Sequence, residues 1–159
     1  MRSTITRRAI LAGAGAILAL PGGRLAQAQA LPKVVVTKDP TCGCCTAWAD
    51  HLRQAGFPVE VEGTGEINRV KTRLGVPASL ASCHTAEVGA YVIEGHVPAA
   101  EIKRLLAERP AGRGLAVPGM PMGSPGMEME GMDPDTYEVV LFGPAGQRIF
   151  ARYRGPRPV

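Results

Sequence analysis

The sequence has 159 residues, of which 45% are hydrophobic and 20% are charged, and it contains four cysteines. This length corresponds to one domain with enough apolar residues to form a core, which excludes a disordered or fibrous chain. The formal net charge of +4 comes from four arginines in the first 30 residues; the remaining 14 basic and 14 acidic residues cancel, so nucleic acid and acidic lipid are not expected as partners.

The first 30 residues are predicted to be a cleaved export signal of the twin-arginine type. Arg7 and Arg8 precede an apolar run at residues 9–20, and Ala28-Gln29-Ala30 offers a small-x-small cleavage site. The run is short and rich in Gly and Ala, which argues against a membrane span, although an uncleaved anchor is the alternative. We therefore expect a mature domain at residues 31–159, located in the periplasm and not attached to the membrane.

The mature sequence predicts alternating strands and helices. A buried strand is expected at residues 33–37, because this stretch is short, β-branched and flanked by prolines. The further expected elements are a helix at 46–55, a strand at 57–62, a helix at 67–74, a strand at 88–94, a helix at 99–108 and a hairpin of residues 137–142 and 147–153. This order predicts an α/β fold with a C-terminal β-hairpin.

Three of the four cysteines, Cys42, Cys44 and Cys45, lie between the first expected strand and the first expected helix. At a helix N-terminus, unpaired backbone N–H groups and the helix dipole favour thiolate over thiol. The C-x-x-C spacing of Cys42 and Cys45 suits either dithiol redox chemistry or metal binding. The third cysteine favours metal, because thiol–disulfide exchange requires only two.

The fourth cysteine, Cys83, precedes the third expected strand and is a candidate fourth thiolate. Two structural disulfides are the alternative, but a bridge within residues 42–45 closes a very small loop and therefore stabilises little. His84 is expected to be a structural histidine, because side chains alternate in an extended chain and His84 would point away from Cys83. His51 shares a helix face with Cys44 but lies about 10 Å along the axis, so it is expected to be a surface histidine.

Residues 118–132 form a loop that contains every methionine of the mature chain, and Pro-Gly-Met-x-Met occurs in it twice. The glycines and prolines exclude a regular helix or strand, so these methionines are not a core stripe. Thioethers are soft ligands that suit Cu(I). The alternative is a flexible loop that happens to use methionine.

Four segments of this sequence together resemble a family of small exported bacterial proteins. They are residues 39–45 (DPTCGCC), 82–85 (SCHT), 94–98 (EGHVP) and 117–127 (VPGMPMGSPGM). The family has been described as a domain of unknown function and as periplasmic metal-binding or copper-resistance proteins, with one branch called CopG. The resemblance implies a thioredoxin-like fold and copper handling by the C-x-C-C cysteines. Cys42, Cys44, Cys45, Cys83, Met120 and Met127 match the family motifs and are the expected metal ligands.

The function predicted from the sequence is binding of Cu(I) in copper handling or resistance. Soft thiolates select Cu(I), zinc or iron–sulfur clusters. Zinc is the second choice, because its ligands usually come as two separated pairs and a methionine-rich loop adds nothing for it. An enzyme of another class, a thiol–disulfide or copper oxidoreductase with Cys42 as nucleophile and Cys45 as resolving thiol, is the alternative. The expected partners are metal ions and other periplasmic copper-handling proteins.

Overall fold

The computed structural model describes residues 30–159, so the predicted signal lies outside the described residues apart from its last position. The helices of this part are α1 (Gly43–Gln54), α2 (Ile67–Leu74), α3 (Ala99–Glu108) and a 3-10 turn, η1 (Ala78–Leu80). The strands are β1 (Val34–Lys38), β2 (Val59–Gly63), β3 (His84–Val88), β4 (Tyr91–Glu94), β5 (Gly114–Ala116), β6 (Thr136–Gly143), β7 (Gly146–Arg154) and β8 (Arg157–Pro158). Within residues 30–159, no helix is both long enough and apolar enough to span a membrane.

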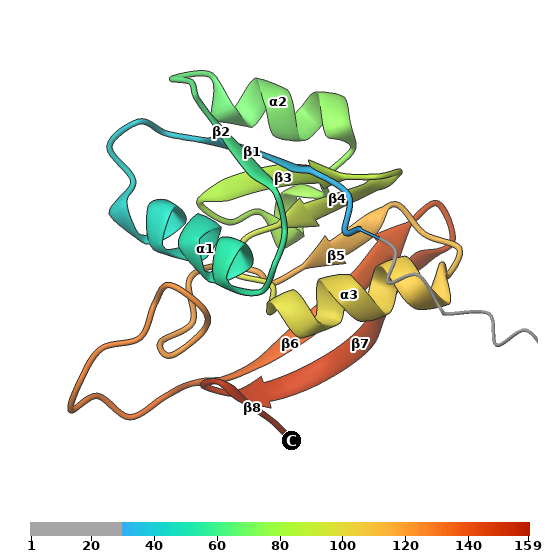
Figure 1. Ribbon diagram of the computed structural model, residues 1–159. Helices are drawn as coiled ribbons and strands as arrows, with labels where there is room; N and C mark the ends of the chain where they lie inside the picture. The colour runs from blue at the N-terminus through green and yellow to red at the C-terminus, as the bar shows by residue number, and fades with distance from the viewer. Residues whose placement is uncertain (1–29) are drawn as a thin grey trace, which may run out of the picture.

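The strands form one sheet in the order β2-β1-β3-β4-β5-β6-β7-β8 (Figure 1). The β1–β2 and β4–β5 pairs are parallel, and the other neighbouring pairs are antiparallel. The α/β class and the C-terminal hairpin of β6 and β7 agree with the sequence prediction. The helix at 67–74 ends as predicted, since Gly75 adopts φ 74°, a left-handed conformation that suits glycine.

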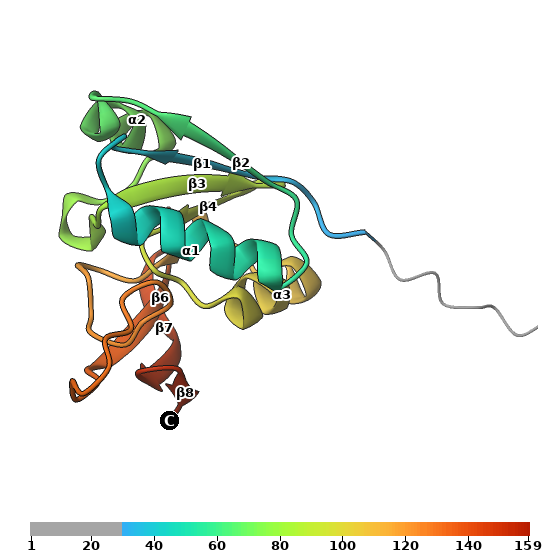
Figure 2. The same cartoon turned by 60° about the vertical axis from the view of Figure 1, so that its left-hand side comes forward.

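The helices cover both faces of the sheet. The larger cluster of buried apolar residues joins α1 and α3 to one face, with Trp48, Leu52 and Ile102 fully buried. The smaller cluster packs Leu74 of α2 and Leu80 of η1 against the opposite face. Figure 2 shows α1 and α3 on one side of the sheet and α2 on the other. The core therefore lies mainly between α1, α3 and the sheet.

The predicted strand at residues 88–94 is wrong. This stretch contains the end of β3, a turn and β4, which form an antiparallel hairpin in which Val88 is opposite Tyr91. Gly89 in the turn has φ 57° and supplies the reversal. The apolar residues on both sides of the turn concealed it in the sequence. Strands β5 and β8 were also missed, since they are too short to show a period-2 pattern.

Candidate metal centre

Strand pairing brings the predicted site segments to one end of the sheet. Lys38, the last residue of β1, is opposite His84, the first residue of β3. Thr85 in turn pairs with Glu94 at the end of β4, and Glu94 pairs with Ala116 at the end of β5. The chain therefore leaves the sheet at the same end in residues 39–45, 82–83, 95–98 and 117–119. These are the four segments that carry the cysteines, one histidine and the start of the methionine loop.

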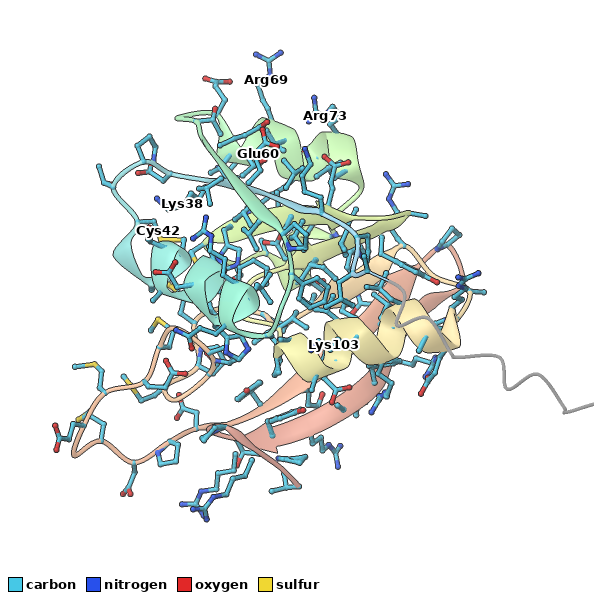
Figure 3. The ribbon with its side chains drawn as sticks, in the orientation of Figure 1. Lys38, Cys42, Glu60, Arg69, Arg73 and Lys103 are labelled. Carbon is cyan, nitrogen blue, oxygen red and sulfur yellow. A yellow bond between two sulfur atoms is a disulfide. The ribbon has the colours of Figure 1, made fainter. Side chains whose placement is uncertain are left out.

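The turn before α1 is held by local hydrogen bonds. The backbone N–H and hydroxyl of Thr41 donate to Oδ1 of Asp39 at 2.8 and 2.6 Å, and these bonds lower the pKa of Asp39. The amine of Lys38 donates to the carbonyl oxygens of Asp39 and Pro40 at 2.9 and 3.3 Å. Figure 3 labels Lys38 and Cys42 at this end of the molecule, where the chain enters α1. The backbone that presents Cys42 is thus fixed from both sides.

All four cysteines meet at this point. Cys42 and Cys45 form a disulfide, while Cys44 and Cys83 are thiols. Sγ of Cys44 lies 3.4 Å from Sγ of Cys42 and 4.0 Å from Sγ of Cys83. The four sulfur atoms lie within 4.8 Å of one another, close enough to surround a metal ion. The alternative of two disulfides is not observed, because the only bridge among the described residues is the one inside the C-x-x-C segment.

Two histidines adjoin the fourth cysteine. Sγ of Cys83 lies 3.3 Å from Nδ1 of His84 and 3.0 Å from Nε2 of His96. Nδ1 of His96 lies 2.8 Å from the carbonyl oxygen of Pro125. A carbonyl oxygen only accepts, so the proton of a neutral His96 is on Nδ1 and the lone pair of Nε2 faces Cys83. This arrangement, in which the remote nitrogen donates to a carbonyl, is typical of histidines that bind metals.

Burial keeps these histidines in the ligand form. The His84 ring packs against Trp48 with 4.3 Å between ring centroids, and it is fully buried. Burial lowers the pKa of His84 well below its usual value, and it also lowers the pKa of His96. Both rings are therefore neutral at pH 7, as metal ligation requires. Nε2 of His84 has no hydrogen-bond partner among residues 30–159.

Burial has the opposite effect on the pKa of the Cys83 thiol. Burial, and after it the nearby Cys44, raise the pKa of Cys83 to about 11. Cys83 is therefore a thiol at pH 7 and loses its proton readily only when a cation binds beside it. A soft metal ion supplies that cation.

The structure corrects the sequence expectation about one histidine near the site and adds a second histidine. The expectation that His84 points away from Cys83 is wrong, because β3 begins only at His84 and the alternation of an extended chain does not include Cys83. His96 was missed as a candidate ligand. Its signal in the sequence was a histidine in the short Gly-His-Val-Pro turn between the end of one strand and the start of a helix. Gly95 has φ 69°, and an added Cβ there would lie 2.5 Å from Oγ of Ser82.

His51 is not a simple surface histidine. Its ring is half-buried, and Nε2 accepts a hydrogen bond of 3.1 Å from the backbone N–H of Ala99, the first residue of α3. His51 therefore caps the N-terminus of α3 and joins it to α1. It is absent from the groups of potential metal ligands found in residues 30–159, as expected from its distance along the helix.

A buried ion pair supports the segment that carries Cys83. Nζ of Lys71 lies 2.6 Å from Oε1 of Glu94, and the same oxygen accepts a hydrogen bond of 2.6 Å from the backbone N–H of Ser82. Burial raises the pKa of Glu94, while Lys71 opposes this effect. The hydroxyl of Ser82 donates to the carbonyl oxygen of Gly119. Ser82 thus connects the cysteine segment to the start of the methionine loop.

The methionine loop packs against the start of α1 in its inner part. Gly126 has φ 84°, and an added Cβ would lie 2.7 Å from the backbone nitrogen of Trp48 and 2.8 Å from the carbonyl oxygen of Cys44. The neighbouring Pro125 holds His96, as described above. Of the two predicted methionine ligands, Met127 is partly buried and directly follows Gly126, whereas 54% of Met120 is exposed.

Comparisons with known proteins identify the family of this chain. The family described as "Protein of unknown function, DUF411" matches residues 80–127, which include Cys83, His84 and His96. No curated protein sequence is similar enough to match the chain. Two solved structures are similar, described as "Copper resistance protein copG- Form 1" and "Copper resistance protein copG- Form 2". The first is 45% identical, with a TM-score of 0.73, and the match covers 79% of this chain and 99% of the other.

The second is 43% identical, with a TM-score of 0.72, and covers 77% of this chain and 98% of the other. Both matches extend over nearly the whole of the solved chains at an identity at which fold and family are shared. The chain belongs to the family of the copper resistance protein CopG.

Proposed function

We propose that this protein binds Cu(I) in copper handling or resistance, through Cys42, Cys44, Cys45 and Cys83 with Met120 and Met127 as further ligands. The observation that supports it most is the convergence of four sulfur atoms within 4.8 Å. His96, with its Nε2 lone pair 3.0 Å from Cys83, adds a nitrogen ligand that the sequence did not suggest. Crowded thiolates bridge neighbouring ions, so more than one copper ion is expected per chain.

Copper fits this set of ligands better than zinc. A structural zinc site is a closed tetrahedron, usually of two separated ligand pairs. Here three sulfurs come from one turn, and two imidazole nitrogens lie 3.3 and 3.0 Å from the sulfur of the fourth cysteine. Thiolates suit Cu(I), zinc and iron–sulfur clusters alike, but the thioethers of the methionine loop suit Cu(I). The similarity to proteins described as copper resistance proteins supports the same choice.

We also propose a cellular location and a fold class for this protein. We infer export to the periplasm from the signal-like residues 1–30, with residues 31–159 as the mature domain. We further infer that the domain is thioredoxin-like. A C-x-x-C disulfide at the N-terminus of a helix that follows a strand supports this inference, as does the mixed sheet with helices on both faces.

The alternative function, an oxidoreductase acting on thiols or copper, is favoured by one observation. Cys42 and Cys45 form a disulfide while the thiol of Cys44 lies 3.4 Å from Sγ of Cys42. Reduction of a disulfide takes up two electrons and two protons, whereas oxidation of Cu(I) to Cu(II) releases one electron. Two Cu(I) ions must therefore be oxidised for each disulfide reduced, and a site holding several coppers meets that requirement.

Metal titration of the reduced protein tests the proposal. The exported protein, reduced with a phosphine under anaerobic conditions, is titrated with Cu(I) against a chromophoric chelator. X-ray absorption at the copper edge then identifies sulfur or nitrogen ligands. We expect Cys42→Ser/Cys44→Ser/Cys45→Ser to lose tight binding and His51→Gln to retain it. Copper bound equally tightly by the triple variant, or a preference for Zn²⁺ in a mixed-metal titration, would overturn the proposal.

The methionine ligands require a separate variant. Met120→Leu/Met127→Leu keeps the apolar volume and removes both thioethers. We expect weaker Cu(I) binding with little change in the melting temperature of the metal-free protein. An unchanged affinity would show that these two methionines are structural.

A further inference from the structure

The methionine loop has two parts with different surroundings. The inner part, up to Met127, consists of successive turns and rests on α1 through Gly126. The chain then runs outward before it returns to β6, as the orange segment of Figure 1 shows. Met129 and Met132 lie in this outer part and are 60% and 55% exposed. The two parts meet at Glu128, whose carboxylate accepts a hydrogen bond of 2.7 Å from the N–H of Gly126.

A single β-turn holds the two outer methionines. The backbone N–H of Met132 donates to the carbonyl oxygen of Met129 at 3.3 Å. Gly131, the third residue of the turn, has φ 77°, which a type II turn requires at that position. The first and last Cα atoms of a β-turn lie within about 7 Å of each other. Two flexible side chains that start this close can place both sulfur atoms on one ion.

Packing does not explain these two side chains. Methionine is usually found in cores, where its flexible chain fills gaps. Here more than half of each side chain is in water, so replacing it by a polar residue would cost little folding energy. Apolar thioethers kept on the surface suit contact with a ligand or partner.

The chain segment that contains the turn is acidic, although its last carboxylate, Glu138, is paired with Arg152. Residues 114–147 contain five acidic side chains and no lysine, arginine or histidine. The acidic residues are Glu128, Glu130, Asp133, Asp135 and Glu138. Glu130 lies within the turn itself, and Asp133 follows it directly. Such a field attracts cations to the turn and speeds their arrival.

We propose that Met129 and Met132 form a separate soft-metal site that accepts Cu(I) at the surface and passes it to the cysteines. This proposal rests on the function proposed above, to which it adds the point of arrival of the metal. The copper remains Cu(I) throughout. It leaves two thioether ligands and forms bonds to thiolates, while the thiol protons go to solvent. A thioether carries no charge, so the outer site binds less tightly than the cysteines and releases copper to them.

The site is tested on the full mature chain with Ag(I), a soft ion that does not change oxidation state. Cys44→Ser/Cys83→Ser, with the Cys42–Cys45 disulfide intact, has no free thiol. Its methionine methyl groups are followed by NMR during the titration. We expect the Met129 and Met132 methyl signals to shift together and saturate at one ion. Because the second thioether binds at an effective concentration of roughly millimolar, Met129→Leu should weaken this binding at least about tenfold.

Two further variants test whether the outer site delivers copper to the cysteines. Met129→Leu/Met132→Leu in the reduced, otherwise unchanged protein should slow copper arrival at the thiolates without changing the number of copper ions that the cysteines finally hold. Met122→Leu, a loop methionine outside the turn, should leave the rate unchanged. If neither outer methyl signal shifts, or if the double variant loads as fast as the parent, the outer site is disproved. If the thiolates of the parent protein take up no copper at all, the proposed function is contradicted instead.

Discussion

The carbonyl oxygen of Pro125 lies 2.8 Å from Nδ1 of His96, so the methionine loop holds the imidazole that faces Cys83. A single bond thus joins the loop, which follows β5, to the turn after β4. The bond fixes both the tautomer and the orientation of His96. Displacement of the loop therefore changes the environment of Cys83 even where no ligand is removed.

Substitution of Gly126 tests this connection. In Gly126→Ala, the added Cβ would meet the backbone of Trp48 and Cys44 at 2.7 and 2.8 Å, so the loop must move away from α1. We expect weaker Cu(I) binding and a loss of unfolding free energy larger than the roughly 1 kcal/mol caused by positive φ alone. Gly146→Ala, in the turn between β6 and β7, is the matched control, because Gly146 also has positive φ but no atom within 4 Å of the added Cβ. Equal copper affinity in the two variants would contradict the expectation.

Replacement of His96 tests its role as a ligand. His96→Phe keeps an aromatic ring in the buried position but removes the nitrogen 3.0 Å from Cys83. We expect fewer nitrogen neighbours of copper in X-ray absorption and a lower Cu(I) affinity. His51→Gln should change neither, since His51 contacts α3 and not the cysteines. A copper spectrum identical to that of the parent would remove His96 from the site.

The oxidation state of Cys42 and Cys45 should control copper capacity. While the disulfide is present, only Cys44 and Cys83 offer free thiols. Reduction adds two sulfur ligands within 4.8 Å of these, so we expect the number of Cu(I) ions bound per chain to rise. Competition titration before and after phosphine treatment measures the number of Cu(I) ions bound per chain. Cys42→Ser/Cys45→Ser should show no such rise, and an equal capacity in both states of the parent would contradict the expectation.

The Lys71–Glu94 pair should stabilise the fold only as a pair. In Glu94→Gln, the amide oxygen still accepts from Ser82, but Lys71 is left buried without a counter-charge. We expect a loss of about 3 kcal/mol in unfolding free energy, measured by urea denaturation. The double variant Lys71→Met/Glu94→Gln should recover part of this loss. If the single variant is as stable as the parent, the charge of Glu94 is not needed.

Acid should weaken the hydrogen bond by which His51 of α1 holds the start of α3. Burial lowers the pKa of His51 below its usual 6.5, so the folded protein binds fewer protons there than the unfolded chain. The stability from this group is therefore present above pH 6.5 and is lost as the pH falls below that value. An imidazolium no longer accepts the hydrogen bond from Ala99.

His51→Gln keeps a hydrogen-bond acceptor but does not titrate, so its unfolding free energy should fall less between neutral and mildly acidic pH than that of the parent. Because His84 and His96 titrate in both proteins, the difference between the two curves isolates His51. Parallel curves would show that protonation of His51 does not affect folding.

The sequence by itself determined the local features of this protein. The period of apolar residues located α2 and α3, and Gly75 marked the end of α2 because glycine adopts the left-handed conformation readily. Likewise, three cysteines within four positions at the expected start of a helix marked the candidate site, and the structure places them at the N-cap and in the first turn of α1. These features depend only on neighbours along the chain.

The tertiary structure decided which distant residues meet. Cys83 lies beside Cys44 because Lys38 at the end of β1 is opposite His84 at the start of β3, a register that no local pattern specifies. His96 joins them because β4 ends beside the start of β3, and the hairpin that causes this was concealed in a continuous apolar stretch. Strand register follows from packing across the whole sheet, so these contacts appeared only in the folded chain.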